Sequence, residues 1–173
     1  LIDSLRIPRT EKFAESISNG YGLPPIIRPD SHFTFLYIIG PTKAYYEELI
    51  PKFRDDLKYK ESDNMYNESA DIATNDSLSP TLDAADDDSS AHNQSSMIIL
   101  FQPQENKKYL FMGDAGREAF DKIPLFHKLK ITNVDWLKVP HHGSKHNLDS
   151  KMIKWIKPKV AYISANSNDE YAN

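Results

Sequence analysis

The residues best suited to chemistry are one aspartate and a pair of adjacent histidines. Asp114 follows an apolar run and a glycine, and His141 and His142 follow an apolar run and a proline. Proline stops a strand and glycine permits tight backbone geometry, so these side chains are expected at strand ends. Ligands collect at such ends in α/β proteins. The pattern therefore predicts a functional site that contains Asp114, His141 and His142.

These residue types favour a metal site. Neutral imidazole is the commonest nitrogen ligand of zinc, and an aspartate oxygen completes a site of borderline hardness. Zinc is the favoured metal, and manganese or iron would fit the same donors. The chain has no cysteine, which excludes thiolate ligands and disulfides. A second interpretation of Asp114 stays open, because aspartate is also a common N-cap of helices.

Length and composition are those of one ordinary domain. The chain has 173 residues, of which 39% are hydrophobic and 27% charged, enough for a single core. The formal net charge of -4 argues against a broad basic surface for nucleic acid. The longest apolar runs are far shorter than the roughly 20 residues of a membrane span. Residues 1–10 lack the pattern of a signal peptide, so a cytoplasmic location is expected.

Strand and helix patterns alternate along the chain, which indicates an α/β layered fold. Helices are expected over residues 9–19, 43–53, 115–120 and 148–156, the second of them capped by Thr42. Strands are expected over residues 33–39, 97–101, 109–112, 134–139 and 159–164. The short polar connection between the second and third strands favours a hairpin.

Residues 61–96 differ from the rest of the chain. They are rich in Ser, Asp, Asn, Glu and Ala and contain almost no large apolar side chain. Such a segment cannot bury enough surface to offset the entropy of ordering it. We therefore expect a disordered acidic insertion outside the core.

Two strings resemble motifs of a known family. YLFMGDAG at 109–116 and LKVPHHGS at 137–144 resemble the fourth and fifth motifs of metallo-β-lactamase-fold hydrolases. The branch that contains the DNA-internalisation competence proteins and the phosphorylcholine esterases is the most similar. Residues 39–49, 93–96 and 157–164 also resemble that branch. Apart from the acidic insertion, the likeness covers most of residues 33–166.

The resemblance implies an αββα sandwich of which this chain carries only the second half. Residues 1–60 would be the middle part of that domain, 61–96 the acidic insertion, and 97–173 the C-terminal half with both motifs. Because the family core pairs two sheet halves, the half present here is expected to expose one apolar face. Its partner would then be the missing N-terminal half, in the same chain or a separate one.

The resemblance also implies two divalent metal ions and hydrolysis of a phosphodiester or another phosphate ester. Asp114 would bridge the metals, His142 would bind one of them, and His141 would contact the substrate phosphate or a leaving oxygen. The first metal-binding cluster of the family, His-x-His-x-Asp-His, does not occur in this sequence. The site is therefore expected to be incomplete, and the chain alone to have little activity.

The remaining histidines are weaker candidates. His92 lies near the position of a third motif ligand, but its polar surroundings favour a loop residue. His32 and His127 have no motif context and are expected to be structural or on the surface. His146 and Asn147 could contribute to the rim of the same pocket, although a solvated loop is favoured for both.

Two other classes of function stay open. One is a non-catalytic interaction module that keeps the fold without metals. Another is a nucleic-acid-binding module that uses the lysines around the HHGS string, although lysines on helix faces are usually solvated. These are Lys138, Lys145, Lys151, Lys154 and Lys157.

Overall fold

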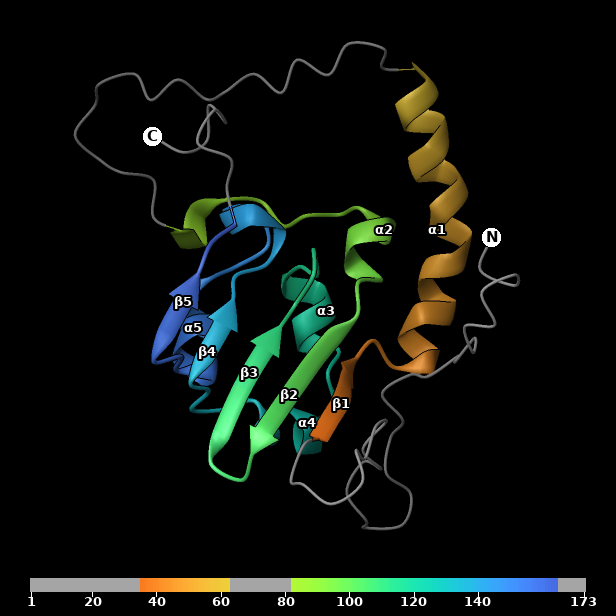
Figure 1. Ribbon diagram of the computed structural model, residues 1–173. Coiled ribbons are helices and arrows are strands. Elements are labelled where there is room, and N and C mark those ends of the chain that lie inside the picture. Colours follow the sequence, from red (N-terminus) through yellow and green to blue (C-terminus); the bar gives the residue numbers. More distant parts are fainter. Residues whose placement is uncertain (1–34, 63–81, 165–173) are drawn as a thin grey trace, which may run out of the picture.

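The computed structural model describes residues 35–62 and 82–164 (Figure 1). The helix expected over 9–19, His32 and residues 63–81 of the expected insertion lie outside these ranges. The described residues form a mixed five-stranded sheet with helices on one face. The α/β class expected from the sequence is confirmed.

The five strands lie in the sheet in the order in which they occur in the chain. They are β1 (Phe35–Gly40), β2 (Ile98–Gln104), β3 (Lys107–Phe111), β4 (Trp136–Lys138) and β5 (Val160–Tyr162). β1, β2 and β3 are antiparallel neighbours, whereas β3, β4 and β5 are parallel. β2 and β3 form the predicted hairpin, in which Leu100 pairs with Leu110.

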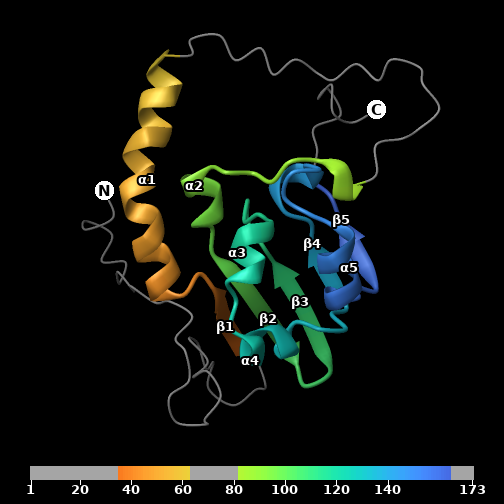
Figure 2. The same cartoon turned by 180° about the vertical axis from the view of Figure 1, so that it is seen from behind.

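Helices α3, α4 and α5 cover one face of the sheet (Figure 2), and α1 packs against α2 beside β1. The helical segments are α1 (Lys43–Ser62), η2 (Leu82–Ala84), α2 (Ala91–Gln94), α3 (Arg117–Asp121), α4 (Leu125–Lys130), η3 (His141–Gly143) and α5 (Ser150–Ile156). The Thr42 hydroxyl accepts a hydrogen bond from the Tyr45 N–H at 3.2 Å, so the predicted cap of α1 is confirmed. In the described ranges, no helix has the length and apolarity that a membrane crossing needs.

The core lies between the sheet and these helices. Leu100, Leu110 and Leu137 are fully buried, one from each of the three central strands. Phe120 of α3 and Ile156 of α5 belong to the same cluster. Because side chains alternate along a strand, the neighbours of these leucines point to the opposite face of the sheet.

That opposite face is apolar and aromatic, and no described element covers it (Figures 1 and 2). The Trp136 ring stacks on Tyr162 at a centroid distance of 5.7 Å and lies 5.3 Å from the Phe111 ring. We call this surface the open face. Its side chains include Ile99, Phe101, Tyr109, Phe111, Trp136, Val160 and Tyr162. Phe111 and Tyr162 are 38% and 53% exposed, so the described residues do present an exposed apolar face of the kind the sequence predicted.

The C-terminal part of the expected insertion is ordered, so that expectation was wrong for residues 82–96. Ala91 and Gln94 are buried. The Gln94 side chain accepts a hydrogen bond from the Ala119 N–H at 2.8 Å and donates one to the Asp88 carbonyl. Gly116 permits this approach, because a Cβ there would lie 2.3 Å from the Gln94 side-chain nitrogen. Apart from Ala91 and Leu82, which contribute to the core, the segment is held by polar contacts, and its composition therefore did not predict order.

Asp135, just before β4, links β3 to the start of β5, and its contribution to the stability of the fold should depend on pH. Its carboxylate accepts hydrogen bonds from Lys159 Nζ at 2.8 Å and from the Lys108 N–H at 2.9 Å. The Lys159 ammonium and then the Lys108 amide hold the pKa of Asp135 below its ordinary value. A carboxylate with a lowered folded-state pKa stabilises the fold above its unfolded pKa, and that contribution is lost as the pH falls through the folded value.

We therefore expect Asp135→Asn to lower the melting temperature at pH 7 and to match the unmodified chain at a pH low enough to protonate the Asp135 carboxyl of the folded state. Thermal unfolding followed by circular dichroism at both pH values measures this. Glu105→Gln, in the exposed turn between β2 and β3, is the control and should change little. An equal loss of stability at both pH values would contradict the electrostatic origin.

Candidate functional site

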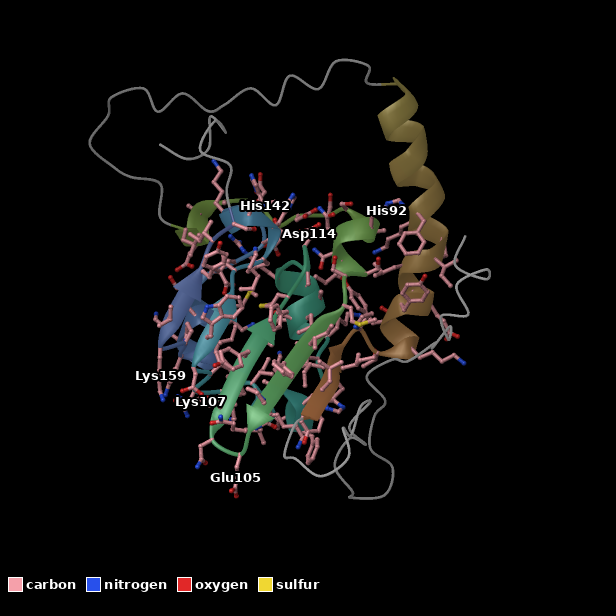
Figure 3. The ribbon with its side chains drawn as sticks, viewed as in Figure 1. His92, Glu105, Lys107, Asp114, His142 and Lys159 are labelled. Carbon is pink, nitrogen blue, oxygen red and sulfur yellow. The ribbon has the colours of Figure 1, made fainter. Side chains whose placement is uncertain are left out.

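The two motif loops meet at one end of the sheet. The His141 N–H donates a hydrogen bond to the Gly113 carbonyl at 3.0 Å, and Asn147 Nδ2 donates one to the Asp114 carbonyl at 2.9 Å. Figure 3 shows Asp114 and His142 at the same end of the sheet, opposite Glu105. β3 and β4 are parallel, so the residues that follow them come together at the carboxyl ends of both strands.

Asp114 lies in a turn between β3 and α3 and is partly buried. Gly116 occupies the N-cap position of α3, so the alternative interpretation of Asp114 as the cap of this helix was wrong. The Asp114 N–H donates to the Ser96 hydroxyl at 3.2 Å. Gly113 precedes it with a φ of +56°, and a Cβ there would lie 3.1 Å from Ser96 Cβ. The turn therefore needs glycine at 113 to place the aspartate.

The backbone of the histidine pair is left-handed. His141, His142 and Gly143 have φ values of 41°, 54° and 92°. For a residue other than glycine this conformation costs about 1–3 kcal/mol, and it persists where the surroundings impose it, often at functional sites.

Each imidazole uses its Nδ1 atom for a hydrogen bond within the protein. His142 Nδ1 donates to the Ser164 carbonyl, just beyond β5. His141 Nδ1 lies 3.1 Å from Asn147 Oδ1. Histidines that bind metals commonly donate one ring N–H to an oxygen acceptor and bind through the other nitrogen. Nε2 is therefore the nitrogen through which each ring could bind a ligand.

Asn147 and Asp88 join the site beneath His141. Asn147 is fully buried, and its Nδ2 donates to Asp88 Oδ2 at 2.8 Å. The Asp88 carboxylate lies 3.6 Å from His141 Nδ1. Sequence reasoning assigned Asp88 to a disordered insertion and favoured a solvated loop for Asn147. The nearest signal was the Asn-Gln-Ser-Ser string at 93–96, because Asn93 Nδ2 also donates to Asp88 Oδ2 at 2.8 Å.

The other described histidines have separate places. His92 lies on α2, not in the loop that was expected, and its ring is 5.0 Å from the Phe53 ring. Figure 3 shows it at the same end of the sheet as Asp114. His127 is fully buried in α4, which agrees with a structural role. His146 is exposed, and its Nδ1 lies 2.8 Å from the Asp86 carbonyl.

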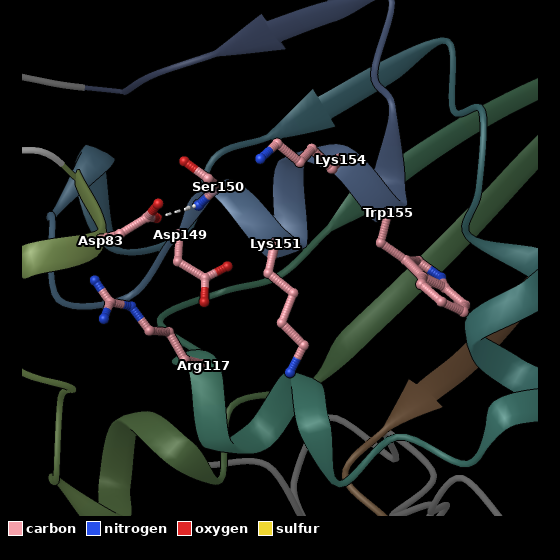
Figure 4. Close-up of a pocket in the computed structure, with 7 residues that line it drawn as sticks. All are labelled: Asp83, Arg117, Asp149, Ser150, Lys151, Lys154 and Trp155. Atoms are coloured by element: carbon pink, nitrogen blue, oxygen red, sulfur yellow. Dashed lines mark hydrogen bonds between the residues drawn. The ribbon is translucent and has the colours of Figure 1, made fainter.

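A hollow between η2, α3 and α5 lies apart from these residues (Figure 4). Asp83 accepts a hydrogen bond from the Ser150 N–H at 2.7 Å, which holds the pKa of that carboxyl below its ordinary value. Asp149 caps α5, and Arg117 donates to the backbone carbonyls of Leu82 and Ala85. These hydrogen bonds attach the segment around η2 to α3 and α5. We therefore assign a structural role to the residues that line the hollow.

The lysines considered for nucleic acid do not share one face. Lys138 belongs to β4 and points to the same side as Trp136, whereas α5 with Lys151 covers the other side. Lys151 also pairs with Asp121 at 2.8 Å. A continuous basic groove around the HHGS string is therefore not favoured.

The donors present fit part of a metal site. Asp114 contributes a carboxylate, and His141 and His142 each contribute Nε2, within two loops that are hydrogen-bonded to each other. Residues 35–62 and 82–164 contain no group of three or more histidines and carboxylates arranged to hold a metal ion.

Comparison with known proteins gives one partial similarity. A stretch of 82 residues, 47% of the chain, is 33% identical to ComE operon protein 3 of Bacillus subtilis (strain 168). That stretch is 10% of the length of the relative, so the chain spans a small part of it. No family model matches the chain, and no solved structure matches it.

Proposed function

We propose that this chain is the C-terminal half of a metal-dependent hydrolase of the metallo-β-lactamase type, which acts on a phosphodiester or another phosphate ester. One observation carries the proposal: a strand-terminal aspartate and two adjacent histidines lie in two loops joined by hydrogen bonds, and both rings have Nδ1 engaged. The similarity to ComE operon protein 3 supports a relationship over 82 residues.

The residues would divide the work as follows. Two divalent ions, with zinc favoured, would supply Lewis acidity and an activated water when bound. The Asp114 carboxylate would lie between them and offset their charge. His142 would bind one of them through Nε2. His141 would direct Nε2 at the phosphate or the leaving oxygen and stabilise the charge that develops there.

The rest of the site must come from elsewhere in the assembly. We propose that a second sheet, from sequence upstream of residue 1 or from a separate chain, packs on the open face and brings the remaining ligands. The open face supports this proposal because its aromatic side chains lie in a continuous row. The Phe101 and Tyr109 rings are 6.1 Å apart, and the Tyr109 and Trp136 rings 6.2 Å.

Metal content and hydrolysis test the proposal. The 173-residue chain should be compared with the same chain extended by the sequence that precedes it in its own gene. We expect less than one zinc per molecule for the former, and two zincs with hydrolysis of bis(p-nitrophenyl) phosphate for the latter. Elemental analysis and release of p-nitrophenol measure these.

Two results would overturn this account. Two metals bound stoichiometrically by the 173-residue chain alone would show that the ligands are wrong. An extended protein that folds but neither binds metal nor cleaves phosphate esters would favour a non-catalytic module.

A further inference from the structure

We infer that Asp88 and Asn147 are positioning residues, which hold the His141 ring in one orientation so that Nε2 is the nitrogen offered to a ligand. The consequence for catalysis rests on the proposed function, whereas the orientation of the ring does not. The inference stands on the hydrogen bonds that Asn147 makes to Asp88 and His141, and on the burial of Asn147 and most of the Asp88 side chain.

The Asp88 carboxylate is a fixed point. Its side chain is 12% exposed, and it accepts hydrogen bonds at 2.8 Å from the Ser90 N–H, Asn93 Nδ2 and Asn147 Nδ2. Its own N–H donates to the His146 carbonyl at 3.1 Å, which joins it to the HHGS loop. Hydrogen bonds to a charged acceptor are about twice as strong as neutral ones, so this carboxylate has little freedom to turn.

Asp88 in turn fixes which way the Asn147 amide faces. Asn147 Nδ2 has two neighbours, Asp88 Oδ2 at 2.8 Å and the Asp114 carbonyl at 2.9 Å. A carboxylate and a carbonyl only accept hydrogen bonds, so the NH₂ group must face them. Turning the amide over would place Oδ1 against both oxygens in a fully buried position and would leave these acceptors without a donor, which is unfavourable.

The orientation of the amide then decides the hydrogen on His141. Oδ1 of Asn147 faces His141 Nδ1 at 3.1 Å and can only accept. Nδ1 must therefore carry the hydrogen, and in a neutral ring Nε2 holds the lone pair. The Asp88 carboxylate, 3.6 Å from Nδ1, adds negative charge on the same side. Rotation of the His141 ring would break the hydrogen bond to Asn147. This bond therefore fixes both the orientation of the ring and the position of its hydrogen on Nδ1.

Nuclear magnetic resonance of ¹⁵N-histidine in the folded chain tests this directly at about pH 8, where imidazole is neutral. In the unmodified chain, the His141 signals should be those of a single form with hydrogen on Nδ1. In Asp88→Asn, the acceptor loses its charge and one of its oxygens becomes an NH₂ donor, which leaves the Asp114 carbonyl to orient the Asn147 amide and lets the amide turn over in part of the molecules. We expect the Nε2 signal of His141 to move toward that of a protonated nitrogen.

Asp86→Asn is the matched control. It removes the same charge two residues away, on an exposed side chain whose backbone carbonyl is its contact to His146. It should leave the His141 spectrum unchanged. In the assembled hydrolase, Asp88→Asn should lower kcat about 10–100-fold with metal content retained, as is typical for residues that orient a site histidine.

The outcomes separate this inference from the proposed function. Hydrogen on Nε2 of His141 in the unmodified chain would overturn the inference, even if Asp88→Asn failed to fold. An unchanged spectrum in both Asp88→Asn and Asn147→Ser would overturn it as well. A changed spectrum in an assembled protein that binds no metal would support the positioning roles and contradict the hydrolase.

Discussion

Asp114→Ala is expected to abolish binding of at least one of two metal ions in the assembled site. A carboxylate between two cations offsets charge that a methyl group cannot replace. The metal content of the purified, extended protein measures this, with folding checked by circular dichroism. Glu105→Ala removes an exposed carboxylate at the opposite end of the sheet and should leave metal content unchanged (Figure 3).

Substitution of the two histidines should have different effects on metal content and on turnover. His142→Ala is expected to weaken one metal and to slow hydrolysis strongly, because a ligand is lost. His141→Ala should keep metal content close to normal while kcat falls about 10²–10³-fold, the usual cost of losing one charge-stabilising contact. His146→Ala, in the same loop, is the control for a general disturbance of the HHGS string.

The metal content and activity of these variants show which histidine binds metal and which contacts the substrate. If His141→Ala strips metal and His142→Ala does not, the two assignments are reversed. The engaged Nδ1 atoms would allow either order, since both rings offer Nε2. If all three variants keep full activity, the active site lies elsewhere and the family-based interpretation fails.

The sequence predicted the parts of this site that depend on local pattern. Asp114 and the histidine pair each follow an apolar run with a residue that ends a strand, and the fold places both runs in neighbouring parallel strands. The hairpin before Asp114 and the helix after the histidines were also predictable, because turn residues and apolar spacing are local signals.

The residues that hold the site histidines by hydrogen bonds could not be predicted in the same way. Asp88 lies 53 residues before His141 in an acidic run whose composition indicates disorder. Its order comes from polar groups of three separate segments: its own, α2 and the HHGS loop. A prediction of disorder from composition considers only the apolar content of a segment. It does not include hydrogen bonds to polar groups that are distant in the sequence. Ser164, whose carbonyl accepts the hydrogen bond from His142, lies 22 residues further along the chain.

Trp136→Glu is expected to leave the 173-residue chain folded and to prevent assembly of the complete site. Trp136 lies in the row of rings on the open face, and its neighbour Leu137 faces the core. Burial of one large apolar side chain contributes about 1.5–3 kcal/mol, and a carboxylate buried without a partner costs several kcal/mol more. Association with the missing N-terminal half should therefore weaken at least about 100-fold.

Titration calorimetry with the separately produced N-terminal half measures this loss of affinity, and zinc content should fall with it. Leu125→Glu is the matched control, because Leu125 is 64% exposed on α4, on the side of the sheet that the helices cover. It adds the same charge without touching the open face and should assemble normally. Should Trp136→Glu assemble with unchanged affinity, the N-terminal half does not pack on this face, and the missing ligands reach Asp114 and the histidines from another direction.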